Sequence, residues 1–228
     1  MNHFLGPLTF AAVAAASAVI GTPVAAAAPS SCSDVEVVFA RGTFEPAGLG
    51  RMGDAFVSEL RSQLPGQSVS TYAVNYPASL DFGGAADGVA DASNHLQDVV
   101  ARCPSTEIVL GGYSQGAAVS GYVTSDSVPA GFALPAGISG PMPAAVADRV
   151  AAVALFGKPS PGIIQLAHQG APPIAIGAPY ASKTIELCAT ADPVCAPGGL
   201  DRAAHSSYVA NGMTTQAAEF AARHLQQY

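Results

Sequence analysis

The chain has 228 residues, of which 50% are hydrophobic and only 11% are charged, and its formal net charge is −7. This length suits one domain with a full hydrophobic core, and the low charged fraction argues against a disordered chain. The negative charge argues against a nucleic-acid-binding protein, because a phosphate backbone would be repelled.

The first segment in chain order is an apolar, alanine-rich run over residues 7–21, followed by overlapping A-x-A patterns within residues 25–28. No Lys or Arg precedes the run, which departs from the usual signal peptide. A membrane anchor is the alternative, but the run is short and bracketed by prolines, so it would span a bilayer poorly. We expect a cleaved signal peptide over residues 1–28, a single domain over 29–228, and a secreted or cell-wall-associated protein.

Beyond this leader, segments typical of strands alternate with segments typical of helices. Short apolar runs predict five strands, over residues 35–40, 69–74, 107–112, 150–157 and 183–188. Helical spacing of apolar residues, or a run of small residues, predicts helices over residues 52–64, 87–102, 116–123 and 214–226. Strands that are apolar throughout are typically buried on both faces, so we predict a three-layer α/β/α sandwich with a central, mainly parallel sheet of about five strands. The Pro- and Gly-rich stretches 129–143 and 158–179 predict surface loops.

The chain has four cysteines, Cys32, Cys103, Cys188 and Cys195. An even number in an exported chain predicts two disulfides, with three pairings to choose from. Cys188 and Cys195 are close in sequence, so a local bridge there would pin a loop and leave the other two cysteines for the second bridge. A metal site is the alternative use of four cysteines, but their wide and uneven spacing disfavours it, and we expect neither a metal nor a cofactor.

The pattern Gly112-x-Ser114-x-Gly116 lies between a predicted strand and a predicted helix. A strand-to-helix turn this sharp strains the backbone of the serine and exposes its hydroxyl, which is the geometry of a nucleophile elbow. The start of the following helix offers unpaired N–H groups and the positive end of the helix dipole, and both suit a developing oxyanion. An ordinary serine in a glycine-rich turn is the alternative, and the flanking strand and helix favour the nucleophile.

A nucleophilic serine needs a base, and the base needs an orienting acid. In α/β hydrolases the acid and then the histidine follow the serine along the chain. Asp192 comes just after the fifth predicted strand, where a catalytic acid is expected, and His205 follows in a loop before the last helix. Asp201 is the main rival acid. His168 comes before any acid at a strand end, and His224 lies in the last helix, so both fit this order less well.

Together these segments resemble the cutinase family of the α/β-hydrolase superfamily, in particular the exported cutinase-like esterases of actinobacteria. The resemblance extends over residues 32–226 and is carried by "VVFARGTFEPAGLG", "GGYSQGAAV", "CATADPVC" and "HSSYV". It implies that Ser114 is the nucleophile, Asp192 the acid and His205 the base. It implies that the backbone N–H groups of Thr43 and Gln115 are the oxyanion donors. It also implies the disulfides Cys32–Cys103 and Cys188–Cys195. Fungal cutinases typically carry serine where Thr43 stands, and they lack the bulk that Phe44 adds beside it.

The function that this resemblance implies is that of a lidless, cofactor-independent serine esterase. Its substrates would be short- to medium-chain acyl esters or polyesters, hydrolysed through an acyl-enzyme. A phospholipase or thioesterase acting on cell-envelope lipids is the enzymatic alternative, and a non-catalytic cell-wall binding protein is the alternative of another class. Val194 and Leu200 either line an acyl groove or belong to the core. We expect a monomer whose partner is a lipid or polyester ester, with transient contact with a lipid surface and no nucleic acid.

Overall fold

Five parallel strands form the central sheet of the computed structural model, which describes Met1 and residues 32–127 and 134–227. Their order across the sheet is β2-β1-β3-β4-β5. The strands are β1 (Val35–Ala40), β2 (Val69–Ala73), β3 (Glu107–Tyr113), β4 (Val150–Phe156) and β5 (Thr184–Leu187). The predicted parallel sheet of about five strands is confirmed. The strand order reverses between β1 and β3, and in open α/β sheets ligands bind beyond the carboxyl ends of the strands at such a point.

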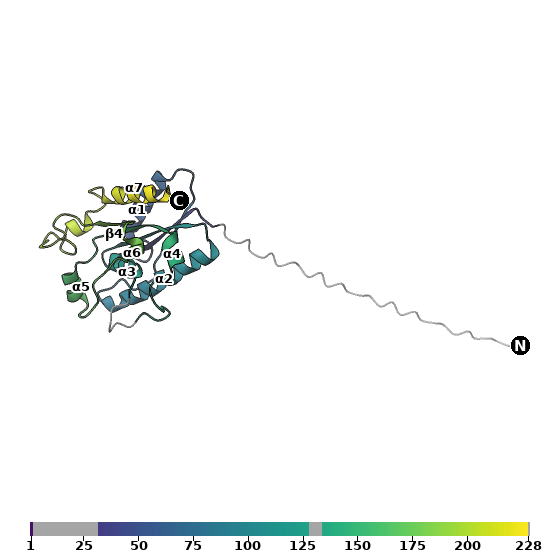
Figure 1. Ribbon diagram of the computed structural model, residues 1–228, viewed down its shortest axis with the longest axis horizontal. Coiled ribbons are helices and arrows are strands. Elements are labelled where there is room, and N and C mark those ends of the chain that lie inside the picture. Colours follow the sequence, from purple (N-terminus) through teal and green to yellow (C-terminus); the bar gives the residue numbers. More distant parts are fainter. Residues whose placement is uncertain (2–31, 128–133, 228) are drawn as a thin grey trace. The chain divides into compact units, whose positions relative to one another are not determined.

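Helices cover both faces of this sheet, which makes the predicted three layers (Figure 1). On one face, α1 (Gly50–Gln63) packs against α7 (Met213–Leu225). The other face carries α2 (Ala85–Arg102), α3 (Gln115–Val123) and α4 (Ala144–Arg149). The shorter elements are α5 (Pro161–Ala167), α6 (Ala178–Ala181) and the 3₁₀ turns η1 (Phe82–Gly84) and η2 (Ala204–Ser206). Among the helices of the described ranges, none is both long and apolar enough to cross a membrane.

The two stretches predicted as loops behave differently. Residues 158–179 contain α5 and the start of α6, so the prediction of one continuous loop was wrong there. The reason is local: the Ser160 side chain accepts a hydrogen bond from the Ile163 N–H, and a proline follows it at the first helical position, which together start a helix. In the other stretch, residues 134–143 form turns and bends without a helix, and the rest lies outside the described residues. The expected signal peptide also lies outside them, apart from Met1.

An aromatic cluster fills the core under the carboxyl ends of the strands. The rings of Phe39, Phe56 and Phe156 lie 5.8–6.4 Å apart, centroid to centroid, and all three side chains are fully buried. Each buried phenylalanine contributes about 2–3 kcal/mol through the apolar surface it removes from water. The ring of Tyr208 continues the cluster, edge-on to Phe156 at 6.1 Å. This core therefore anchors the segment that carries His205 to the sheet.

Both disulfides join the cysteine pairs that the resemblance implied. Cys32–Cys103 connects the residues just before β1 to the end of α2, with 5.6 Å between the Cα atoms. Cys188–Cys195 closes a short loop directly after β5, with 5.8 Å between the Cα atoms. The first bridge fastens the amino end of the sheet, and the second closes the loop that carries Asp192.

Candidate active site

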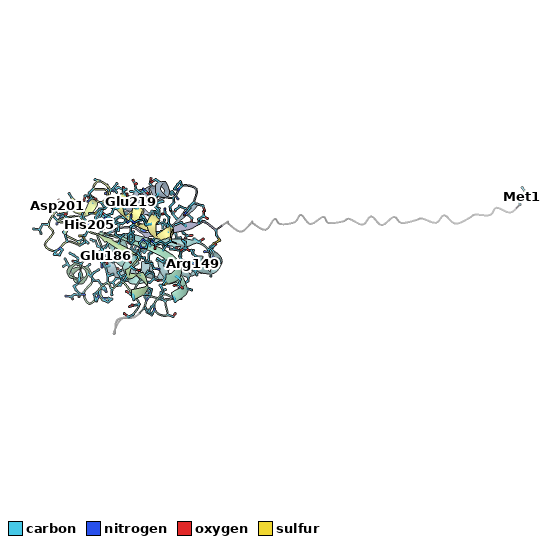
Figure 2. All side chains as sticks on the ribbon, turned by 45° about the horizontal axis from the view of Figure 1, so that its top comes forward. Met1, Arg149, Glu186, Asp201, His205 and Glu219 are labelled. Carbon is cyan, nitrogen blue, oxygen red and sulfur yellow. A yellow bond between two sulfur atoms is a disulfide. The ribbon has the colours of Figure 1, made fainter. Side chains whose placement is uncertain are left out.

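The residues singled out from the sequence meet at the carboxyl end of the sheet. Ser114 follows β3, Thr43 follows β1, Asp192 follows β5, and His205 lies in η2. Figure 2 shows His205 at one end of the folded unit and Arg149, which directly precedes β4, at the other. Thr43 and Ser114 thus directly follow the two strands between which the strand order reverses.

Ser114 occupies a strained turn between β3 and α3. Its backbone angles are φ 55° and ψ −118°, a conformation that residues with a side chain rarely adopt. Its N–H donates to the carbonyl of Phe156 over 2.8 Å, which ties the turn to β4. A β-carbon at Gly116 would overlap the carbonyl oxygen of Ala40, and one at Gly112 would overlap the backbone of Gly116. The two glycines of the motif are therefore required for the close approach of strand, turn and helix.

Ser114, His205 and Asp192 form a continuous chain of hydrogen bonds. The Ser114 Oγ lies 2.8 Å from His205 Nε2. The other ring nitrogen, Nδ1, lies 2.8 Å from Asp192 Oδ2 and 3.0 Å from Oδ1. Since a carboxylate only accepts, Nδ1 is the donor and Nε2 is left to accept the serine proton. This is the arrangement of a nucleophile, a general base and an orienting acid.

Asp192 is fully buried, and protein donors surround its carboxylate. In addition to His205, the Val194 N–H donates to Oδ1 over 2.8 Å, and the Tyr208 hydroxyl donates to Oδ2 over 2.5 Å. A buried carboxylate is tolerated only when it is paired in this way. Burial, together with the hydrogen bond to Asp192, raises the pKa of the Tyr208 hydroxyl well above its ordinary value. Tyr208 lies within "HSSYV", but nothing in that segment alone predicts its contact with Asp192.

Tyr113, the residue before the serine, holds His205 from the other side. Its ring stacks on the imidazole with 5.0 Å between centroids, and its hydroxyl donates to the His205 carbonyl over 2.5 Å. Burial raises the pKa of Tyr113 to about 12, so the hydroxyl stays protonated and keeps its donor. No local pattern distinguishes Tyr113 from the other residues around the motif.

Thr43 and Gln115, the two expected oxyanion donors, are neighbours. The Thr43 hydroxyl donates to Gln115 Oε1 over 3.4 Å, and Gln115 Nε2 donates to the Ser79 carbonyl over 2.9 Å. Gln115 is the first residue of α3, so its backbone N–H lies at the helix N-terminus, where N–H groups lack intrahelical acceptors. The buried Gln115 side chain thus connects the loop after β1 to the start of α3.

The loop after β1 is itself held by two charged side chains. Arg41 is buried, and its guanidinium donates to the carbonyls of Tyr76 (2.7 Å) and Glu45 (2.9 Å). The Glu45 carboxylate accepts from the N–H groups of Gly42 (2.7 Å) and Arg51 (2.9 Å). These contacts fix the backbone on both sides of Thr43.

The competing acids and histidines do not reach this chain of hydrogen bonds. Asp201 is exposed, and its Oδ1 accepts from the N–H of Ala203 over 2.9 Å, a cap for the turn that leads to η2. His168 is exposed at the end of α5. His224 Nδ1 donates to the Phe220 carbonyl within α7 over 2.9 Å. Within the described ranges, no group of three or more His, Cys, Asp or Glu side chains is arranged to hold a metal ion.

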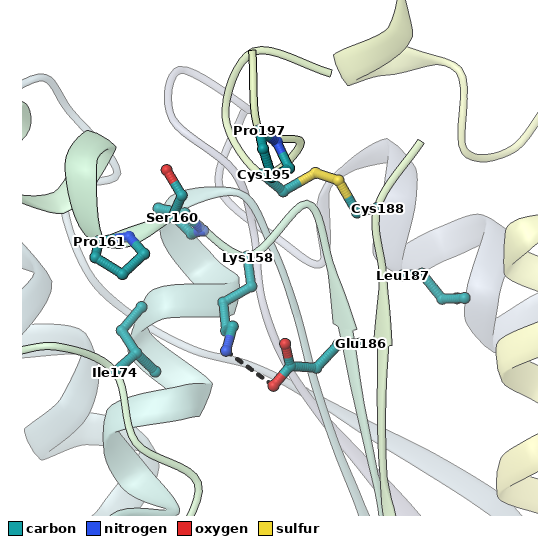
Figure 3. Close-up of a pocket in the computed structure, with 10 residues that line it drawn as sticks. Lys158, Ser160, Pro161, Ile174, Glu186, Leu187, Cys188, Cys195 and Pro197 are labelled. Atoms are coloured by element: carbon teal, nitrogen blue, oxygen red, sulfur yellow. Dashed lines mark hydrogen bonds and ion pairs between the residues drawn. A yellow bond between two sulfur atoms is a disulfide. The ribbon is translucent and has the colours of Figure 1, made fainter. Parts of the chain in front are cut away.

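A pocket of about 320 Å³ lies beside the Cys188–Cys195 bridge (Figure 3). None of Ser114, Asp192 and His205 lines it. Figure 3 shows the Lys158 ammonium paired with the Glu186 carboxylate in this pocket, over 2.8 Å. Because this pocket holds none of the three hydrogen-bonded side chains, the serine at the carboxyl end of the sheet remains the best candidate for the reacting centre.

The parallel sheet and the serine–histidine–aspartate chain at its carboxyl edge define an α/β hydrolase. The family model described as Cutinase matches residues 31–225, and the chain therefore belongs to the cutinase family. It is 50% identical to Carboxylesterase Culp1 of Mycobacterium tuberculosis over 224 residues (98% of this chain, 95% of the relative). It is 48% identical to Phospholipase Culp4 of the same species over 221 residues (97% and 92%).

A solved cutinase of Trichoderma reesei, in complex with a phosphonate inhibitor, superposes with a TM-score of 0.62 at 30% identity, over 85% of this chain and 77% of that one. Family membership and these relatives make the chain a carboxylic ester hydrolase, and they favour an enzyme over the non-catalytic binding protein.

Proposed function

We propose that the chain hydrolyses carboxylic esters with Ser114 as nucleophile, His205 as general base and Asp192 as orienting acid. The observation that carries the proposal is the unbroken hydrogen-bonded chain from Ser114 Oγ through the imidazole to a fully buried carboxylate. The strained elbow at Ser114 supports it, because strain in a non-glycine residue is characteristic of functional sites.

The proposed reaction begins when His205 Nε2 takes the hydroxyl proton as Ser114 Oγ attacks the ester carbonyl. Asp192 stabilises the resulting imidazolium, and the N–H groups of Thr43 and Gln115 receive the oxyanion. The alcohol leaves with the proton from His205, so that an acyl ester on Ser114 remains. Water, activated by the same imidazole, then releases the acid and restores the serine.

Hydrolysis of p-nitrophenyl butyrate by three variants tests the assignment. Ser114→Ala should abolish turnover, and Asp192→Asn should lower kcat about 10⁴-fold, because it disturbs the histidine tautomer. Asp201→Asn is the matched control: it makes the same chemical change 9 residues further along the chain, and it should leave kcat unaltered. Equal rates for wild type and Ser114→Ala would rule out the nucleophile, and loss of turnover only in Asp201→Asn would rule out the acid.

For the substrate, we propose short- to medium-chain acyl esters or polyesters, as the similarity to Culp1 and to the Trichoderma cutinase supports. A phospholipase is the second candidate, because the chain is nearly as similar to Phospholipase Culp4 as to Culp1. A series of p-nitrophenyl esters of increasing chain length, compared with phosphatidylcholine in mixed micelles, separates the two. A kcat/KM that is higher for the phospholipid than for every simple ester would favour the phospholipase.

We also propose transient contact between the site and a lipid or polymer surface. Three large apolar side chains are exposed on loops at the site: Phe44 by 73% and Leu200 by 89% on loops that carry site residues, and Leu80 by 69% beside Ser79, whose carbonyl accepts from the Gln115 side chain. Phe44 directly follows Thr43, and its N–H donates to the carbonyl of Ala78, so these two loops are joined. The exposure of Leu200 makes it a surface residue rather than a core residue. Replacing Phe44 and Leu80 with Ser should weaken binding to phosphatidylcholine vesicles and leave the hydrolysis of a water-soluble ester unaltered.

Export completes the proposal: residues 1–28 would be removed as a signal peptide, and the domain would be secreted or kept in the cell wall. Two disulfides support an oxidising compartment, because such bonds are rare in the cytosol. N-terminal sequencing of protein from the culture medium and from the wall fraction tests this. A mature chain that starts at Met1 would contradict cleavage.

A further inference from the structure

Tyr208 combines complete burial with direct contact to the carboxylate of Asp192. The residue is 0% exposed, and its hydroxyl oxygen lies 2.5 Å from Asp192 Oδ2. Because an ionised carboxylate only accepts, the tyrosine is the donor. A hydrogen bond from a neutral donor to a buried charge is short and about twice as strong as one between neutral groups.

The contacts of the Asp192 carboxylate indicate what the Tyr208 hydroxyl does. His205 Nδ1 lies within 3.0 Å of both carboxylate oxygens. The imidazole alone therefore does not fix the rotation of the carboxylate about its Cβ–Cγ bond. The Val194 N–H binds Oδ1, and the Tyr208 hydroxyl binds Oδ2. With one donor on each oxygen, the plane of the carboxylate is fixed.

We propose that Tyr208 is a positioning residue: its hydroxyl fixes Asp192 in the orientation that holds the imidazole of His205 toward Ser114. This inference rests on the proposed function of these three residues. It adds a fourth residue, which acts on the acid and does not contact the substrate. The same hydrogen bond holds the carboxylate in place against the imidazole, and this carboxylate is the group that stabilises the imidazolium when the Ser114 proton moves.

Tyr208 also has structural contacts, and a test must separate these from positioning. Its ring packs edge-on to Phe156, and its hydroxyl accepts from the Ala189 N–H over 3.3 Å and lies 3.4 Å from Cys195 Sγ. Removing the hydroxyl would therefore disturb the neighbouring loop even if it did nothing for Asp192. A double-mutant cycle separates the two roles, because coupling through Asp192 disappears when Asp192 is already replaced.

The experiment compares wild type, Tyr208→Phe, Asp192→Asn and the double variant in p-nitrophenyl butyrate hydrolysis. Titration of Ser114 with a p-nitrophenyl phosphonate counts the folded sites in each preparation, so that kcat refers to active protein even if a variant folds poorly. Tyr122→Phe is the matched control. Tyr122 lies near the C-terminal end of α3, and this change removes a tyrosine hydroxyl that donates to the Pro172 carbonyl.

We expect Tyr208→Phe to lower kcat at least about tenfold with little change in KM, the loss that follows from removing one hydrogen bond to a charged group. In the Asp192→Asn background the same change should cost less than about threefold, because the charge on which the hydroxyl acts is gone. The low-field proton resonance of His205 Nδ1–H should move in Tyr208→Phe and stay in place in Tyr122→Phe.

An equal loss in both backgrounds, or wild-type kcat in Tyr208→Phe, would overturn the positioning role. Neither result would affect the proposed triad as long as Ser114→Ala is inactive. Conversely, an active Ser114→Ala variant would overturn the triad itself, and the role of Tyr208 with it. The two proposals therefore fail in distinguishable ways.

Discussion

Replacing Gly157 with alanine should disturb the acid and base of the site without changing any group that takes part in the chemistry. Gly157 directly follows β4 and has a φ of 58°, and its N–H donates to the Leu187 carbonyl over 2.8 Å. A β-carbon built there would lie 2.8 Å from the Tyr208 hydroxyl, 3.1 Å from His205 Cε1 and 3.3 Å from Asp192 Oδ2. The side chain of an alanine would therefore press on all three groups together.

The size of the effect follows from these distances. To reach an ordinary contact of 3.4 Å, the Tyr208 hydroxyl would have to move by roughly 0.6 Å. Since a misplacement of about 1 Å costs about 100-fold in rate, kcat should fall about tenfold. For stability, the left-handed backbone costs about 1–2 kcal/mol, partly offset by about 0.4–1 kcal/mol from the stiffer unfolded chain. Crowding adds about 1–3 kcal/mol.

Gly198 provides the matched control, because its φ is 69° and a β-carbon there would meet nothing within 4 Å. Gly198→Ala should carry the backbone cost without the crowding, and should keep the wild-type kcat. The assay is p-nitrophenyl butyrate hydrolysis with urea unfolding of the same preparations. Wild-type kcat in Gly157→Ala, or an equal loss of kcat in Gly198→Ala, would refute the assignment of the effect to crowding at the site.

Three further perturbations have expected outcomes. Burial raises the pKa of Tyr113 and of Tyr122 from 10.0 to about 12. Because the unfolded chain loses these protons first, the stability that the two tyrosines contribute is complete below pH 10 and is lost as the pH rises from 10 to 12. Thermal unfolding across that range should show Tm decreasing. Replacing Cys188 and Cys195 with Ala should lower the free energy of unfolding by about 2.5 kcal/mol, because the bridge closes a short loop; an unchanged urea midpoint would contradict this. Glu186→Gln should cost less than about 1 kcal/mol and leave KM unaltered, whereas a raised KM would assign the pocket of Figure 3 to the substrate.

The parts of the fold that the sequence predicted are those in which local pattern and tertiary environment agree. The seven residues of β4 are all fully buried, so their apolar run was recognisable without any knowledge of neighbours. The motif around Ser114 was informative for a related reason. Its glycines are required by the close approach of the backbone of Ala40 and of α3. This requirement can be recognised in the sequence as the two glycines that flank the serine.

The parts that escaped prediction depend on contacts between distant segments. Tyr208 reaches the carboxylate of Asp192 across 16 residues, and Tyr113 reaches the backbone of His205 across 92. Neither tyrosine has a local pattern that distinguishes it from an ordinary buried aromatic residue. α5 was missed for a different reason: it is short and buries only Ile164, so it lacks the apolar face on which helix prediction depends.

The candidate site therefore combines two kinds of support, and they should respond differently to perturbation. Ser114 lies in the tight turn between β3 and α3, and Gln115 is the first residue of α3; both elements are held by regular hydrogen bonding and by a fully buried core. Asp192 and His205 lie outside the strands and α-helices. The Tyr113 hydroxyl ties the His205 segment to β3, the short disulfide closes the Asp192 loop directly after β5, and the Tyr208 hydroxyl joins the two segments to each other. Because local unfolding begins where few regular hydrogen bonds cross, the acid and base should become disordered before the nucleophile does. Mild denaturant should thus reduce turnover while the elbow that presents Ser114 is still folded, and hydrogen exchange should be faster in residues 189–207 than in α3.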